Sequence, residues 1–172
     1  MPGALWLAYC GYLAWLCAGL FDFIVHRRTD LPHTSGVAES ATHLIQLGLL
    51  GTAIVVGLAF DVGRGTALLM GALVVAHAVV GYIDSRIAFA RRRVVSPVEQ
   101  HLHSVLDMAP IIAFGSLLLW TWPAALHSGG ASLRQPAFAP TTWLAILVPA
   151  ILLCVVPALV EFRAAWKARR EA

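Results

Sequence analysis

The chain has 172 residues, enough for one domain, with 59% hydrophobic residues, 12% charged residues and a mean hydropathy of +0.78. This composition excludes an ordinary soluble enzyme and predicts an all-α integral membrane protein, a single transmembrane domain over residues 1–172. The net charge of +3 comes with Lys and Arg residues near the ends of apolar segments, which predicts contact with lipid head groups and not with nucleic acid.

Five apolar segments are long enough to cross a bilayer, which takes about 20 residues in a helix. We expect a helical bundle with spans at about 4–26, 37–60, 66–90, 97–122 and 141–164. Pro149 and Pro157 lie inside the fifth segment and predict a kink there. That segment carries no histidine, so we expect it to be structural or to act as a gate.

The first four segments each carry acidic and histidine side chains on one helical face. In chain order they are Asp22 with His26, Glu39 with His43, His77 with Asp84, and Glu99 with His103 and Asp107. Residues four apart differ by about 40° around a helix axis, and residues seven apart by about 20°. Each set therefore points in nearly one direction. Ionisable groups in a membrane helix usually face the bundle interior and mark a functional site.

Most of the cations lie on one side of an alternating five-span layout. They are Arg27, Arg28, Arg86, Arg91, Arg92, Arg93, Arg163, Lys167, Arg169 and Arg170, whereas only Arg64 and Arg134 fall on the other side. By the positive-inside rule the C-terminus is cytoplasmic and the N-terminus outside, in what we expect to be the cytoplasmic membrane of a bacterium. The acidic and histidine residues then lie in the cytoplasmic half, and His77 and Asp107, about 15–20 Å deep, are expected to meet.

These side chains predict a dinuclear metal site. Buried charges are tolerated only when they are paired or bound to metal, and two divalent cations would offset the carboxylates. Mixed carboxylate and imidazole ligands suit iron, with zinc or manganese as alternatives. We expect Glu39, Glu99 and Asp107 to be catalytic carboxylates that bridge or bind the metals. The nitrogen ligands are expected to be the four histidines listed above, His26, His43, His77 and His103. Asp22 and Asp84 are expected to be ligands or groups that orient the imidazoles.

Histidines at the cytoplasmic ends of membrane helices resemble those of the membrane-bound di-iron hydroxylases and desaturases. The matching positions are His26, His43, His77 and His103. The resemblance covers ligand types, topology and site location; the nearest counterpart of the family's His-x-x-x-His and His-x-x-His-His boxes is His101-Leu102-His103, which fits neither. It implies hydroxylation or desaturation of a lipidic substrate by dioxygen. Electrons would come from an external donor protein, since the sequence has no flavin, nicotinamide or iron–sulfur motif.

Other classes of protein stay open on the sequence. A zinc form of the site would make the protein a hydrolase or a lipid-modifying enzyme. A haem between His43 and His103 would make it an electron carrier, and a relay of acids and histidines an ion or proton transporter. Without a metal, the acids would pair directly with the histidines (Asp with His) or with arginines (Glu with Arg), for which the candidates are Arg27, Arg28, Arg86 and Arg91.

Three more histidines lie outside these sets. His33 is a candidate for metal entry or substrate gating, because it lies in the loop close to the predicted site. His101 lies about 160° from Glu99 on the same helix and is expected to be an outer group or exposed. His127 is expected to be solvated in an irregular outer loop.

Overall fold

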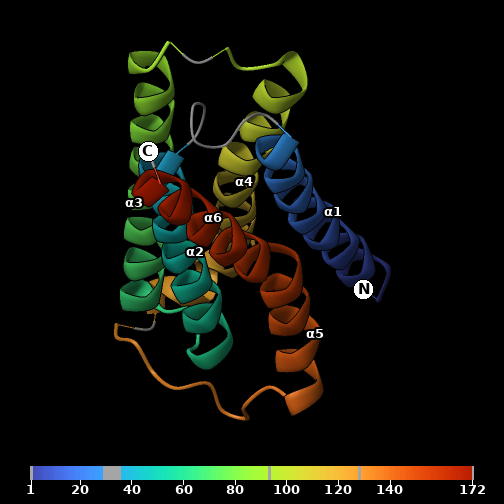
Figure 1. Ribbon diagram of the computed structural model, residues 1–172. Coiled ribbons are helices and arrows are strands. Elements are labelled where there is room, and N and C mark those ends of the chain that lie inside the picture. The colour runs from blue at the N-terminus through green and yellow to red at the C-terminus, as the bar shows by residue number, and fades with distance from the viewer. Residues whose placement is uncertain (1, 29–35, 93, 128, 172) are drawn as a thin grey trace.

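A computed structural model describes residues 2–28, 36–92, 94–127 and 129–171. The helices are α1 (Pro2–Arg28), α2 (Gly36–Ala59), α3 (Arg64–Ala90), α4 (Pro97–His127), α5 (Pro140–Ala150) and α6 (Val156–Glu171), and a π-helical turn (Ile151–Val155) joins α5 to α6 (Figure 1). With α5 to α6 counted as one span, five helices of the described chain are long and apolar enough to cross a membrane. The predicted all-α class with five such segments is confirmed.

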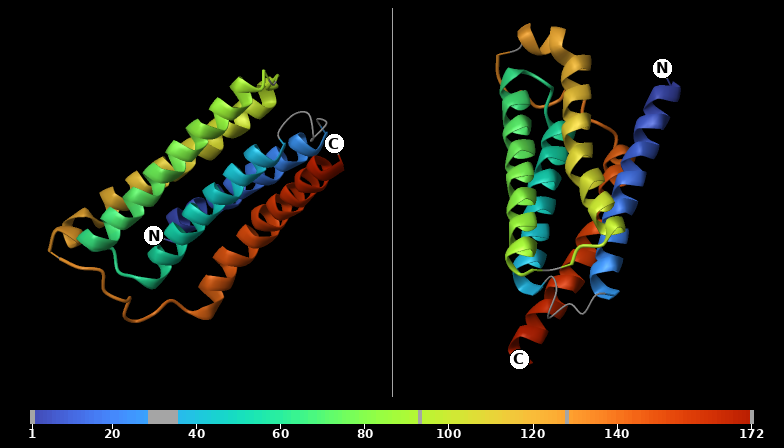
Figure 2. Two further views of the ribbon diagram at one scale, coloured as in Figure 1. Left: turned by 60° about the vertical axis from the view of Figure 1, so that its left-hand side comes forward. Right: turned by 90° about the horizontal axis from the view of Figure 1, so that it is seen from above.

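The helices lie in three layers, with α1 and α2 in the middle. On one side α2 packs against α3 and α1 against α4, while on the other α2 packs against α6 and α1 against the π-helical turn. Figure 2 shows α3 and α4 as a pair on one side of the middle layer and the α5–α6 span on the other. The ends of α1 and α3 and the starts of α2 and α4 therefore share one end of the bundle.

Apolar side chains cover the outer faces of the helices. Large exposed examples are Leu5, Leu68, Phe89, Leu119 and Leu152. The buried apolar core is small by comparison, and its centre consists of Leu16, Phe23, Cys154 and Ala158. Such extensive exposed apolar surface would promote aggregation in water but suits contact with lipid. This distribution is consistent with an integral membrane protein.

The fifth span is irregular just before Pro157. Proline has no N–H, and its ring clashes with the carbonyl group four residues earlier in a regular α-helix. Here the preceding turn is π-helical, and the Val156 N–H donates to the Ile151 carbonyl five residues earlier. The irregularity expected from the prolines thus occurs as a π turn at Pro157, whereas α5 continues through Pro149.

The opposite end of the bundle is closed by the segment that precedes α5. Arg134 donates hydrogen bonds to the carbonyl groups of Gly57 and Phe60, at 3.2 and 2.9 Å, and so caps the end of α2. Its guanidinium also lies 3.3 Å from the carboxylate of Asp61. These contacts hold the α2–α3 connection in place. The buried acidic and histidine residues lie toward the other end of the bundle.

Candidate metal centre

Acidic and histidine side chains gather at the end of the bundle where α1 ends and α2 begins. We call this group the buried cluster, and it consists of Asp22, His26, His43, Asp84, Glu99, His103 and Glu161. All are buried except His103, which is largely buried. Its members come from α1, α2, α3, α4 and α6, so every membrane span contributes.

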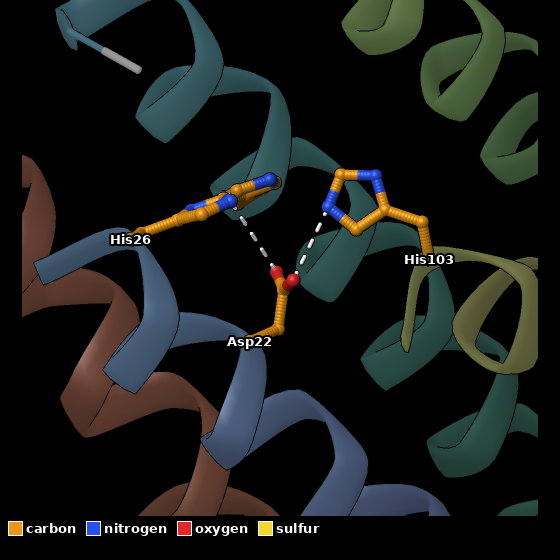
Figure 3. A group of neighbouring side chains, drawn as sticks. Asp22, His26 and His103 are labelled. Atoms are coloured by element: carbon orange, nitrogen blue, oxygen red, sulfur yellow. Dashed lines mark ion pairs between the residues drawn. The ribbon is translucent and has the colours of Figure 1, made fainter. Parts of the chain in front are cut away.

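Four of these side chains form the closest group. One potential ligand atom from each of Asp22, His26, His43 and His103 lies within 4.8 Å of the others. Asp22 lies between two imidazoles (Figure 3): its Oδ1 is 3.2 Å from His103 Nε2, and its Oδ2 is 3.9 Å from His26 Nε2. The rings of His26 and His43 stack with centroids 5.0 Å apart. The group has the atoms and the spacing to hold a metal ion.

Two further carboxylates, from α3 and α4, face the same imidazoles. Glu99 Oε1 lies 3.0 Å from His26 Nε2, and Asp84 Oδ2 lies 3.6 Å from His43 Nε2. Each Nε2 atom of the three histidines therefore faces at least one carboxylate. The imidazoles and carboxylates lie together in one region and do not point to separate surfaces.

Hydrogen bonds hold both of these carboxylates in place. Ser96 and Glu99 form a capping box at the start of α4: the Glu99 N–H donates to Ser96 Oγ at 3.2 Å, and the Ser96 N–H donates to Glu99 Oε2 at 3.4 Å. Asp84 accepts a hydrogen bond from the Thr42 hydroxyl. One Glu99 oxygen thus caps a helix while the other faces His26.

The last span brings a carboxylate to the other ring nitrogens. Glu161 is fully buried; its Oε2 lies 3.6 Å from His26 Nδ1, and its Oε1 lies 3.6 Å from His43 Nδ1. The Ser40 hydroxyl donates a 2.9 Å hydrogen bond to Glu161. A carboxylate beside one ring nitrogen orients a histidine so that the other ring nitrogen can bind a metal.

Glu161 is not among the residues predicted from the sequence, because the fifth span carries no histidine and was expected to be structural or a gate. A search for acids and histidines on the same helix misses an acid whose histidine partners lie on other helices. A usable signal was nevertheless present. Glu161 shares one helical face with Cys154, Ala158 and Ala165, three small side chains that are all buried.

The residues of the expected deeper layer, His77 and Asp107, line a small cavity beside the buried cluster. The cavity has a volume of about 70 Å³, and three members of the closest group line it as well. Gly81 makes room for Asp107, since a Cβ at this position would lie 2.8 Å from Asp107 Oδ1. Neither His77 nor Asp107 belongs to the closest group, so their assignment as metal ligands stays a prediction.

The remaining predicted residues differ in their placement. Glu39 is fully buried in the first turn of α2, and its assignment as a catalytic ligand stays a prediction. His101 is exposed on α4, one of the positions expected for it. His33 and the side chain of His127 lie outside the described residues.

Histidines are prominent partners of the buried acids. Within the described part of the chain, the ion pairs of Asp22, Asp84 and Glu161 each join a carboxylate to an imidazole. Arg27 and Arg28, two of the alternative partners, are exposed. A donor set of imidazoles and carboxylates in a dry interior suits a divalent transition metal.

No protein-family model, no curated protein and no solved structure matches this chain. The function is therefore inferred from the geometry and chemistry of the site.

Proposed function

We propose that the protein is a membrane-embedded, metal-dependent oxidoreductase. In this proposal the buried cluster holds two divalent metal ions, preferably iron, with zinc or manganese as alternatives. The enzyme oxidises a lipidic substrate with dioxygen, by hydroxylation or desaturation. The proposal depends on one observation: Asp22 and the imidazoles of His26, His43 and His103 offer ligand atoms within 4.8 Å of one another. Glu161 supports it, because its carboxylate lies beside Nδ1 of His26 and Nδ1 of His43.

The position of Asp22 supports two metal ions over one. Its two oxygens face different histidines, as a bridging carboxylate would require (Figure 3). Glu99 adds a carboxylate beside His26, and Asp84 adds one beside His43. Helical bundles build dinuclear sites from such inward-facing acids and histidines.

A lipidic substrate is supported by an apolar cavity beside the site. It has a volume of about 590 Å³ and is lined by residues of α1, α2, α3 and α4. A cavity of this size is typical of small-molecule sites, which range over about 300–1,000 Å³. Iron in such a centre supplies the capacity to activate dioxygen, and the electrons come from an external donor protein.

Two alternatives fit the geometry less well. The rings of His43 and His103 are nearly perpendicular, with centroids 6.5 Å apart, and the neighbouring polar cavity of about 70 Å³ has no room for a haem. A transporter would need a polar path through the other half of the bundle, where the large cavity is almost wholly apolar. A zinc hydrolase would use the same ligands, so the metal content decides between it and the oxidoreductase.

The orientation belongs to the same proposal. The N-terminus is placed outside and the C-terminus in the cytoplasm, with the metal centre near the cytoplasmic face of a bacterial inner membrane. The distribution of Lys and Arg residues supports this orientation.

Metal analysis of paired histidine variants tests the proposal. Protein purified in detergent after expression with iron is expected to carry two iron ions per chain and, once reduced, to consume dioxygen when membrane lipid is added. His103→Ala should lose metal, whereas His101→Ala should retain it, because His101 lies on the same helix but is exposed. Full metal content in His103→Ala would refute the site. Native zinc with no oxygen uptake would refute the oxidoreductase.

A further inference from the structure

Two cavities meet beside the buried cluster, and the smaller one contains the ionisable side chains among an otherwise apolar lining. The small one, which we call the polar chamber, measures about 70 Å³, and the large one, the apolar chamber, about 590 Å³. Trp15 and Leu50 line both chambers, so these two side chains mark the place where the chambers adjoin. A ligand that extends past them would contact both the candidate metal centre and the apolar chamber, which opens to the outer surface at Ala8, Ile112 and Ala113.

The polar chamber has unsatisfied hydrogen-bonding capacity. Gln46, His77 and Asp107 line it together with four members of the buried cluster. His77 is only 4% exposed, and its Nδ1 has no hydrogen-bond partner in the described chain; the same holds for the indole Nε1 of Trp15. Buried polar atoms without partners are costly, so they favour a polar ligand in the chamber, which each nitrogen would reach after a small rotation of its side chain. Since one water needs about 10–15 Å³ of such space, the chamber has room for a group of a few atoms.

The charges around the polar chamber disfavour an anionic ligand. Asp22, Asp84 and Asp107 line it, and no Lys or Arg is among its described lining residues. Of the described lining residues, three therefore carry carboxylates and none carries an ammonium or guanidinium group. A carboxylate or phosphate head would therefore enter a region that is already negative.

The apolar chamber suits an aliphatic chain. Its lining consists mainly of Ala, Gly, Leu, Ile, Val, Met and Phe residues. The Tyr12 hydroxyl, one of the few polar groups there, already donates to the Ile146 carbonyl at 2.8 Å. The chamber thus offers few polar contacts, and burial of apolar surface would dominate binding.

We propose that the centre takes a long-chain amphiphile with a small uncharged polar head. The head occupies the polar chamber, with His77, Gln46 and Trp15 as its hydrogen-bonding partners, and the chain occupies the apolar chamber. This placement puts the carbons next to the head, and not the middle of the chain, nearest the buried cluster. As a substrate assignment it rests on the proposed function, but the binding geometry can be tested without turnover.

Fluorescence quenching of Trp15 tests the binding geometry. The protein is prepared in detergent with the other five Trp residues replaced by Phe, both metal-free and iron-loaded. The probes are 4,5-dibromo-octadecan-1-ol, 4,5-dibromo-octadecanoate and 4,5-dibromo-octadecane, because bromine quenches tryptophan on contact and Trp15 is expected beside the carbons near the head. We expect saturable quenching by the alcohol, and about tenfold weaker binding of the other two probes, the factor that about 1.4 kcal/mol gives.

Two variants locate the chain and the head. Ala113→Phe places a bulky group in the apolar chamber and should abolish the saturable quenching, whereas Ile111→Phe, exposed on the same helix but outside the chamber lining, should not. His77→Leu should weaken binding of the alcohol and leave that of the alkane unchanged. Circular dichroism and gel filtration verify that each variant is folded.

The outcomes separate this inference from the proposed function. Equal quenching by the three probes, preference for the carboxylate, or no effect of Ala113→Phe would overturn the inference. If iron binding is intact in those cases, the metal centre stands. Selective binding of the alcohol by a protein that binds no metal would support the two-chamber site and reject the oxidoreductase.

Discussion

A single carboxylate lies beside two imidazoles of the candidate metal centre. The oxygens of Glu161 face Nδ1 of His26 and Nδ1 of His43, whose rings are stacked, and Ser40 holds the carboxylate from α2. The imidazoles thereby present their Nε2 atoms to Asp22 and the other acids. In the proposed metal centre Glu161 would be a positioning residue, and the metal affinity of the centre should depend on it.

Substitution of Glu161 tests this dependence. We expect Glu161→Gln to lower the iron affinity about 10-fold and Glu161→Ala about 100-fold, the range reported for loss of such orienting partners. Glutamine retains an oxygen that can accept a hydrogen bond from one Nδ1–H, so its effect is smaller. Competition with a coloured chelator measures the affinity. Glu171→Gln is the control, because Glu171 is exposed on the same helix beside Lys167; equal affinities in all variants would contradict the assigned role.

Much of the buried cluster could be predicted from spacing along single helices. Asp22 and His26, four apart, do point toward the same interior, since side chains one turn apart share a helical face. Spacing gives no distance between helices, however. It therefore could not separate Asp107, one turn beyond His103, from the closest group, nor identify the partners of Glu161, which lie on α1 and α2.

The π turn sets the direction in which α6 presents its residues. A π turn contains about one residue more than the α-helical path requires, and each residue rotates a helix by about 100°. The turn at 151–155 therefore determines which face of α6 meets α2. The prolines predicted an irregularity in this span. The sequence could not show that it is a π turn, because the type of irregularity depends on how the backbone accommodates Pro157, which has no N–H to donate.

Single-residue deletions test the role of the π turn. Deleting Leu152, exposed within the turn, together with Pro157→Ala should convert the turn to α-helix and leave Glu161 facing the histidines. Deleting Leu159 in α6, also exposed, should rotate Glu161 by about 100° relative to α5. We expect iron binding to survive the first change and to be lost in the second. The opposite result, measured as iron per chain, would show that α6 is positioned by its own contacts.

The buried cluster joins all three layers of the molecule. Its residues come from the middle helices, from the α3–α4 pair and from α6, so metal bound there would cross-link every span. The number and approximate limits of the spans could be read from hydropathy; the third was expected at 66–90 and is Arg64–Ala90. The order of the layers could not be read from hydropathy, because it depends on side-chain packing between helices that are far apart in the sequence.

Removal of metal should destabilise the whole bundle. A ligand that binds only the folded state raises the free energy of unfolding by about 2.7 kcal/mol when its concentration is one hundred times its dissociation constant. Without it, buried carboxylates also repel one another. We expect a chelator to lower the melting temperature of the wild-type protein and iron to restore it. His103→Ala should melt at the same temperature with and without iron; a metal-independent wild type would argue that the helices alone stabilise the fold.

Because Glu161 lies in the fifth span, the order in which the helices are synthesised affects when the proposed metal centre can form. A nascent chain inserts its helices in order, so His26, His43 and His103 enter the membrane before the carboxylate that orients two of them. Metal captured early would meet loosely held imidazoles and exchange readily. In the proposed centre, firm loading would therefore await insertion of the fifth span, and retention of the ion would report that this span has packed against the first four.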